Sequence, residues 1–259
     1  MQTILFHDTI FGPIHSRRLG TSLGVNLSPS DGKVCSFDCL YCEAGYNAQG
    51  PGKTGLPPRR YVREALEARL AAMHANGENL DVITFSGNGE PTLHPDFAGI
   101  IEDTIALRDR YFGDVKISVL SNSTQLHRPD VVEALKRIDN NILKLDSAIE
   151  DTMRALDRPA SPSFTVSRVI PQLQAFDGNL IVQTLLTRGT HGGRIIDNTT
   201  DTELDALIEA IRAIAPASVM LYSIDRRTPE QSLERVSRAE LDAAAARITA
   251  ATGVPVSVA

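Results

Sequence analysis

Residues 35–42 read Cys35-Ser-Phe-Asp-Cys39-Leu-Tyr-Cys42 and contain all three cysteines of the chain. The spacing C-x3-C-x2-C places three thiolates on one short loop, so that all three can bind a single metal centre. A closed zinc site needs a fourth protein ligand, and the nearest upstream candidates are His7 and His15. A [4Fe–4S] cluster usually takes four cysteines, so three of them leave one iron open to a ligand from outside the protein. An open iron favours catalysis over simple electron transfer.

The composition around this stretch is that of an ordinary globular protein. The chain has 259 residues, of which 42% are hydrophobic and 22% charged, and its formal net charge is -6. These values exclude a mainly disordered chain, a collagen-like fibre and a disulfide-dense scaffold. The acidic balance argues against a globally basic nucleic-acid binder. Because neither a targeting segment nor an apolar run of about 18 residues is visible, we expect a cytoplasmic protein with reduced thiols and no membrane span.

Short apolar runs alternate with amphipathic stretches along most of the chain. The runs predict strands at 23–27, 82–86, 115–121, 142–146, 180–186 and 218–224, with a peripheral seventh at 254–258. The stretches predict helices at 61–74, 95–111 and 165–176, and helices that begin at Pro129, Thr200 and Ser237. Repeated strand–helix units imply an α/β fold with a parallel sheet, either open or closed towards a barrel. We expect one domain over 1–259, with its core at about 20–228.

Polar residues follow nearly every expected strand. In both parallel architectures the ligand site lies where the carboxyl ends of the strands meet, so these polar segments are expected at one rim. The segments are 35–42, 87–91, 121–123, Lys144 with Asp146, 188–194 and 225–227.

Two of these segments together resemble the radical S-adenosylmethionine (SAM) superfamily. One is the cysteine loop with its aromatic Tyr41 before the last cysteine; the other is Gly87-Asn88-Gly89-Glu90-Pro91, which is similar to the superfamily's Gly-Gly-Glu-Pro element. The resemblance implies that the cysteines hold a [4Fe–4S] cluster, that SAM binds the open iron, and that reductive cleavage gives methionine and a 5'-deoxyadenosyl radical for hydrogen abstraction. It also implies that the turn at 87–91 holds the methionine ammonium. Glycines allow the close backbone approach and a carboxylate accepts from an ammonium, so the chemistry is reasonable.

A longer resemblance narrows the group. Residues 12–27, the cysteine loop and residues 86–95 resemble wybutosine-biosynthesis-like Fe–S oxidoreductases, and the likeness extends from about Gly12 through the sixth strand. It implies a partial (β/α)6 TIM-like barrel of the radical SAM type. The wybutosine enzyme itself condenses a guanosine of tRNA with pyruvate, so a tRNA nucleoside is a candidate substrate here.

Further candidates come from the next two strand ends. Ser121 and Asn122 suit contacts to the ribose or carboxylate of SAM, and equally suit a turn or helix cap. Lys144 and Asp146 are two apart on a strand, so they share a face, while Leu143 and Leu145 face the helices. As catalytic candidates, Lys144 contacts the SAM carboxylate and Asp146 orients Lys144 or binds substrate. The alternative is a structural ion pair that lines the barrel.

The remaining rim residues carry weaker signals. Gln183, Tyr222, Asp225 and Arg226 are candidates for adenine or substrate contacts. The basic, glycine-rich segment 188–194 is interpreted as a mobile loop, either solvated or closing over an anionic substrate. Two histidines at helix approaches, His94 and His127, are interpreted as capping or hydrogen-bonding residues. Several arginines would mark a phosphate-bearing or RNA partner if they cluster in the fold; otherwise they are solvated or ion-paired charges. They are Arg17, Arg18, Arg59, Arg60, Arg63, Arg226 and Arg227.

Three functions remain open from the sequence. The first is a radical SAM enzyme, with a tRNA nucleoside, a glycyl-radical enzyme or a peptide as substrate. It needs an external electron donor of the flavodoxin or ferredoxin type, because neither a flavin motif nor a second cluster motif is visible. The second is a zinc-stabilised module that binds RNA or protein, and the third is a plain electron-transfer protein.

Overall fold

A computed structural model describes residues 4–16 and 19–259. Within these residues, eight strands form one sheet in the order β1-β2-β3-β4-β5-β6-β9-β11. The strands are β1 (Ile10–Ser16), β2 (Gly20–Val25), β3 (Val82–Phe85), β4 (Lys116–Ser121), β5 (Asn140–Lys144), β6 (Ile181–Leu185), β9 (Ser218–Tyr222) and β11 (Val256–Val258). The α-helices are α1 (Arg59–Ala75), α2 (Phe97–Tyr111), α3 (Pro129–Lys136), α4 (Glu150–Asp157), α5 (Val166–Gln174), α6 (Asp201–Ile214) and α7 (Arg238–Thr252).

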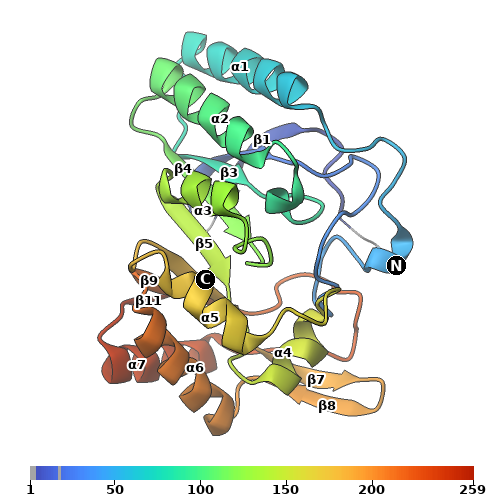
Figure 1. The fold of residues 1–259 in the computed structure, drawn as a ribbon, viewed down its shortest axis with the longest axis vertical. Helices are drawn as coiled ribbons and strands as arrows, with labels where there is room; N and C mark the ends of the chain where they lie inside the picture. Colours follow the sequence, from blue (N-terminus) through green and yellow to red (C-terminus); the bar gives the residue numbers. More distant parts are fainter. Residues whose placement is uncertain (1–3, 17–18) are drawn as a thin grey trace.

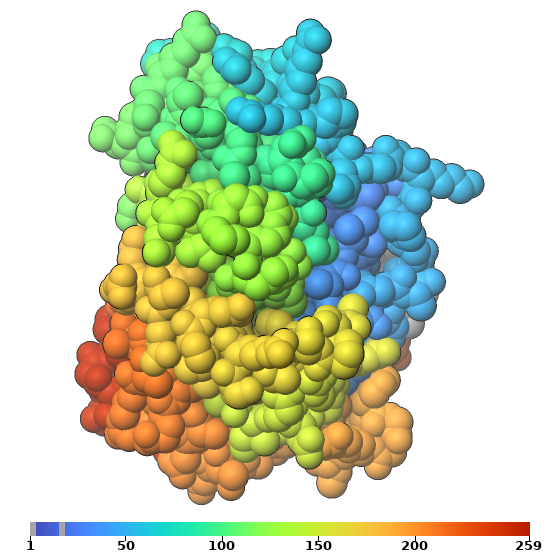
Figure 2. Space-filling model, in the orientation of Figure 1, coloured from blue at the N-terminus to red at the C-terminus, as the bar shows by residue number. Residues whose placement is uncertain are grey.

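The sheet is a partial barrel. The strands from β2 to β9 and the peripheral β11 pair in parallel, each with its neighbour in the order above. The sheet ends at β1 and β11 without closing, and helices cover one of its faces, as Figure 1 shows. The same view in space-filling form shows this helical face running from α1 and α2 at the top to α6 below (Figure 2). The expected α/β fold, with six parallel strands and a seventh at the edge, is confirmed.

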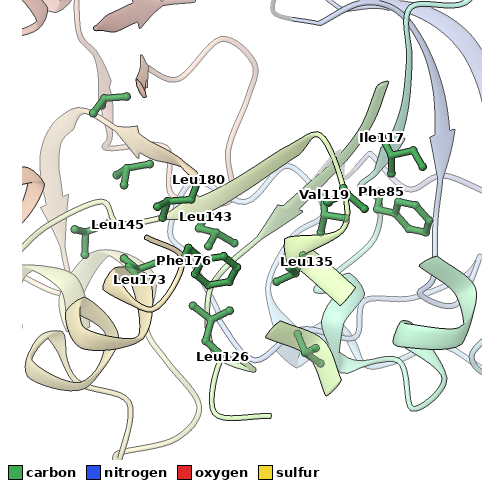
Figure 3. Close-up of a cluster of buried hydrophobic side chains, with 14 of the residues drawn as sticks. Phe85, Ile117, Val119, Leu126, Leu135, Leu143, Leu145, Leu173, Phe176 and Leu180 are labelled. Atoms are coloured by element: carbon green, nitrogen blue, oxygen red, sulfur yellow. The ribbon is translucent and has the colours of Figure 1, made fainter. Parts of the chain in front are cut away.

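The hydrophobic core lies between the sheet and these helices. Alternate residues of each inner strand point to the helices, so Val119 and Leu143 pack against side chains such as Leu135 and Phe176 (Figure 3). These four side chains are almost fully buried. The opposite face of each strand lines the inside of the barrel. Because side chains alternate along a strand, the same five residues of β5 supply both the core and the barrel interior.

Five elements differ from the sequence expectation. The expected loop at 188–194 is wrong: Thr187–His191 (β7) and Arg194–Asp197 (β8) form a hairpin, and Glu234–Arg235 (β10) pairs with β7 to complete a small second sheet. Gly192 and Gly193 form its turn with φ of 57° and 79°, a conformation that suits a tight hairpin turn. The sequence pattern predicts neither β1 nor α4. In the structure, β1 pairs antiparallel with β2 at the sheet edge.

Candidate functional site

Most of the expected rim residues line one cavity of about 420 Å³ at the carboxyl ends of the parallel strands. Residues as far apart in sequence as Cys35 and Thr228 meet there because the parallel strands all end at the same side. The lining includes these residues expected from the sequence: Cys35, Cys39, Tyr41, Cys42, Gly87, Gly89, Glu90, Ser121, Asn122, Lys144, Gln183, Tyr222, Asp225 and Arg226.

The cysteine loop is fastened to the end of α4. The Leu40 amide donates to the Leu156 carbonyl at 3.0 Å, and the Asp38 amide donates to the Asp157 carbonyl at 3.0 Å. Phe37 of this loop is buried and packs edge-to-face on Phe164, with ring centroids 5.1 Å apart. These contacts hold the loop with all three thiols towards the cavity.

The donor set fits an iron–sulfur cluster. Burial raises the pKa of the Cys35 thiol to about 12 and raises the pKa of Cys39 well above its ordinary value, so both thiols stay neutral until a metal centre displaces the proton. Within the described residues, no group of three or more His, Cys, Asp or Glu side chains is arranged around a single metal ion. The described residues that line the cavity include neither His7 nor His15, the ligand candidates for a zinc site.

The turn at residues 87–90 is joined directly to the cysteine loop. The Val34 amide donates to the Asn88 carbonyl at 3.2 Å, and the Glu90 amide donates to the Val34 carbonyl at 3.0 Å. A Cβ atom on Gly89 would lie 1.9 Å from the Val34 carbonyl oxygen, and Gly87 has a φ of +154°. Glycine is therefore required at Gly89 by close packing, and the turn and the loop form one unit.

Asn88 and Pro91 belong to this turn, but neither is among the described residues that line the cavity. Both are buried, and Pro91 begins a short 3-10 helix (Pro91–Leu93). The Asn88 side chain bonds the backbone of Phe6 and Pro29 instead. A motif places the backbone of such a turn, but it does not reveal where an individual side chain points.

Glu90 is a buried carboxylate on the cavity wall. Its Oε1 accepts from the amide and the hydroxyl of Thr92, and its Oε2 accepts from the Asn122 amide at 2.6 Å. Burial raises the pKa of Glu90, whereas the hydrogen bonds from Asn122, Thr92 and Ser121 oppose that rise. None of the groups that shift its pKa most strongly is a lysine or an arginine. The anionic form of Glu90 is therefore best matched by a cation that enters the cavity.

Ser121 and Asn122 continue the wall between Glu90 and the cysteines. The Asn122 side-chain amide donates to Ser36 Oγ at 3.0 Å and lies 3.6 Å from Cys35 Sγ. The hydroxyl of Ser121 accepts from the Ser123 amide at 3.1 Å. Both expected residues therefore line the cavity, and both also stabilise the turn after β4.

The expected ion pair of Lys144 and Asp146 is present, with Lys144 Nζ 3.2 Å from Asp146 Oδ2. Lys144 Nζ also donates to Tyr41 Oη at 2.5 Å, and the Tyr41 hydroxyl bonds Asp146. Burial disfavours the charge of Lys144, but its neighbours, Asp146 first among them, raise its pKa well above the usual value. Lys144 is thus a cation on the cavity wall. The Asp146 side chain is 0% exposed and is not among the described residues that line the cavity; it contacts Lys144 and Tyr41 instead.

Sequence reasoning missed a second acid in this cluster. Asp157 Oδ1 lies 3.2 Å from Tyr41 Oη and 3.5 Å from Cys39 Sγ. Burial, followed by the charge of Asp146, raises the pKa of Asp157 well above its ordinary value. Its position depends on α4, a helix of eight residues that the periodicity did not indicate. No local motif marked this residue.

Replacing Lys144 by methionine is expected to lower the free energy of unfolding of the cluster-free protein by about 3 kcal/mol, because Asp146 is left buried without its cation. Denaturant unfolding under anoxic conditions measures this loss. Lys136→Met, at a partly exposed lysine 3.8 Å from Glu133, is the matched control and is expected to change stability by less than about 0.5 kcal/mol. Equal stability of the Lys144 variant and the unaltered protein would show that the pair is not stabilising.

The other basic and histidine candidates lie elsewhere. Arg59 pairs with Asp103 of α2 at 2.7 Å, and Arg60 pairs with Glu64 at 2.7 Å, so the arginines at the start of α1 are occupied on the helical layer and do not face the cavity. Arg226 does reach the mouth, where it pairs with Glu43 at 2.7 Å. Arg17 and Arg18 lie outside the described residues. The rings of His94 and His127 hydrogen-bond the carbonyls of Pro57 and Thr124, respectively. On the second sheet, Arg188 pairs with Glu240 and His191 pairs with Glu230.

The chain is similar to known proteins in its family model, its sequence and its fold. The family model described as the radical SAM superfamily matches residues 30–163. A Brachyspira hyodysenteriae protein named GTPase Obg is 29% identical over 91% of this chain and 32% of its own length. A Synechocystis UPF0026 protein is 30% identical over 86% of this chain and 77% of its own length. This chain spans 66% of the matching UPF0026 protein of Helicobacter pylori.

Solved structures share the fold at low identity. A radical SAM methyltransferase from Sphaerobacter thermophilus has a TM-score of 0.66 and 16% identity, over 92% of this chain and 65% of that one. TYW1 with a lysine-pyruvate adduct bound has a TM-score of 0.60 and 14% identity, over 90% of this chain and 75% of the TYW1 chain. In the part of the chain that the structure describes, no helix has the length and apolarity to cross a membrane.

Proposed function

Because the chain belongs to the radical SAM superfamily, which uses a [4Fe–4S] cluster and SAM, we propose that both are held in the cavity by the residues described above. Cys35, Cys39 and Cys42 ligate three irons, and the fourth iron is left to SAM. When bound, the reduced cluster supplies the electron that cleaves SAM to methionine and a 5'-deoxyadenosyl radical. The protein binds, orients and shields these groups.

The observation that carries the proposal is the meeting of three thiols and a buried carboxylate in one cavity. Glu90 lines the cavity, and no lysine or arginine is among the groups that shift its pKa most strongly, so a bound cation suits it. SAM carries an ammonium and a sulfonium. Gly87 and Gly89 line the cavity, and the lack of a Cβ atom at both positions lets the turn pack closely against Asn26 and Val34. This arrangement suits an amino acid headgroup held beside the cysteines.

The other wall residues take separate roles in the proposal. Lys144 offers a charged donor to the SAM carboxylate, and Ser121 and Asn122 offer polar groups to the carboxylate or the ribose. Tyr41 packs beside the adenine, and its position is fixed by Lys144 and Asp146. Asp146 is a positioning residue in this account, because its side chain does not reach the cavity.

The substrate that we propose is a nucleoside of tRNA, and the electron donor is a flavodoxin-like or ferredoxin-like protein. The support is the resemblance of residues 12–27 and 86–95 to the wybutosine-biosynthesis-like group. At the mouth of the cavity, Arg226 is an exposed cation paired with Glu43, and a phosphate of the substrate would take the place of that carboxylate.

An anoxic extract from a strain that lacks the protein tests the substrate. The reduced enzyme and SAM are incubated with its tRNA fraction and, separately, with its protein fraction. The proposal predicts that tRNA alone raises the rate of 5'-deoxyadenosine formation at least about tenfold and gains a mass change in one nucleoside. Stimulation by the protein fraction alone would overturn the tRNA proposal and indicate a peptide or glycyl-radical enzyme. A colourless protein that contains zinc would overturn the radical function itself.

A further inference from the structure

The segment at residues 4–9, here called the N-terminal strap, connects the two parts of the cofactor site from outside the cavity. The Ile4 amide donates to the carbonyl of Glu43, the residue that follows Cys42, at 2.9 Å. Two residues later, Phe6 bonds the turn at 87–90 through Asn88. One short segment therefore contacts both the cysteine loop and the turn.

Asn88 provides the link between the strap and the turn. Its Oδ1 accepts from the Phe6 amide at 2.7 Å, and its Nδ2 donates to the carbonyls of Phe6 at 2.8 Å and Pro29 at 2.9 Å. The Asn88 side chain is 0% exposed and uses its donor and acceptor groups on the backbone of these two residues. The amide of Asn88 itself donates to Asn26 Oδ1 at 3.1 Å, which fixes the turn from the side of β2.

The strap is held in place by ring stacking. Phe6 stacks on Phe11 of β1 with centroids 3.9 Å apart and an interplanar angle of 20°. Phe11 in turn lies on Gly24 of β2, where a Cβ atom would lie 2.1 Å from the ring. Neither phenylalanine is among the described residues that line the cavity. Any effect of the Phe6 ring on SAM binding must therefore be indirect.

We propose that Asn88 and the N-terminal strap are positioning elements for SAM: they hold the turn at 87–90 in the conformation that binds the methionine end. The turn contains two glycines and would otherwise sample other backbone conformations. Because apparent affinity is reduced by the fraction of molecules in the competent conformation, a turn that is competent one-tenth of the time binds about tenfold more weakly. This inference rests on the proposed function.

The test uses full-length protein carrying a reconstituted cluster, with SAM affinity measured by anoxic equilibrium dialysis. Asn88→Ala and Phe6→Ala are each expected to weaken SAM binding about tenfold and to raise KM for SAM in the cleavage reaction. Iron content and kcat at saturating SAM are expected to stay at the level of the unaltered protein. Phe6→Tyr keeps the stacked ring and is expected to restore normal affinity.

A matched control separates positioning from stability. Phe112 packs edge-to-face on His74 at 5.7 Å, next to the end of α2 and outside the cavity lining, so Phe112→Ala also removes a partly buried ring. It is expected to lower stability and to leave SAM affinity unchanged. The inference is overturned if Phe6→Ala and Asn88→Ala bind SAM within twofold of the unaltered protein, or if Phe112→Ala weakens binding equally. Failure of the unaltered protein to bind SAM would instead overturn the proposed function, and this inference with it.

Discussion

Replacing Cys39 by serine is expected to abolish the brown colour of the anoxically reconstituted protein and to lower 5'-deoxyadenosine formation at least about 1,000-fold, which corresponds to ~4 kcal/mol of activation free energy. Cys39 is the most buried of the three thiols, and its sulfur faces the cavity beside Asp157. A hydroxyl at this place is a poor ligand for iron, and the chain has no other cysteine to replace it. Iron analysis, the visible spectrum and product quantification check the result.

Ser36→Ala is the matched control for Cys39→Ser. Ser36 lies in the same loop, and its hydroxyl bonds Thr124 Oγ1 at 2.5 Å. It is not among the described residues that line the cavity. This variant is expected to keep its iron and to retain activity within about threefold. Retention of a full cluster by the Cys39 variant would contradict the assignment of the three thiols.

Replacing Glu90 by glutamine is expected to weaken SAM binding roughly 100-fold, or ~2.8 kcal/mol. The amide has nearly the same shape, but it lacks the buried negative charge that we match to the ammonium of SAM. The glutamine oxygen still accepts from either Thr92 or Asn122, so the turn can keep part of its hydrogen bonding. Equilibrium dialysis at constant pH measures the loss.

The same carboxylate gives SAM binding a pH dependence. Burial raises the pKa of Glu90, and only the ionised form attracts a cation, so affinity is expected to fall as the pH falls through that raised pKa. For the empty protein the sign is opposite. A raised pKa means that folding holds the proton more tightly, so this contribution to stability is present at low pH and is lost as the pH rises through the folded-state pKa. Glu90→Gln is expected to flatten both dependences.

Glu203→Gln serves as the control for Glu90→Gln. Glu203 is also buried and accepts from Ser147 Oγ at 2.6 Å, but it lies on α6 outside the lining of the cavity as described. Its replacement is expected to leave SAM affinity within twofold. If both variants weaken SAM binding equally, the charge of Glu90 has no specific role in recognition.

Much of the site could be predicted because parallel strands bring their carboxyl ends together. The two-residue spacing of Lys144 and Asp146 predicted a shared face, and the structure places both inside the barrel with Leu143 and Leu145 in the core. The spacing did not reveal how deeply each of the two side chains is buried. Lys144 reaches the cavity, whereas Asp146 is held beneath it by Tyr41 and the Leu185 amide.

The parts that could not be predicted depend on contacts between distant segments. Asp157 joins the cluster of Tyr41 and Asp146 only because α4 packs under the cysteine loop. The composition of segment 188–194 favours a mobile loop, but Gly192 and Gly193 form the turn of a hairpin there. Arg59 lies near other arginines in sequence, yet the adjacent helix supplies Asp103 as its partner. Composition and spacing carry no information on such partners.

The central claim is that the cysteine loop and the turn at 87–90 form one site for a cluster and SAM. Its most direct test is anoxic reduction of the iron-loaded protein with SAM, followed by quantification of 5'-deoxyadenosine and methionine. We predict a brown protein that forms both products in equal amounts, with none in the Cys39→Ser variant. An intact, reduced [4Fe–4S] cluster that leaves SAM uncleaved would contradict the account.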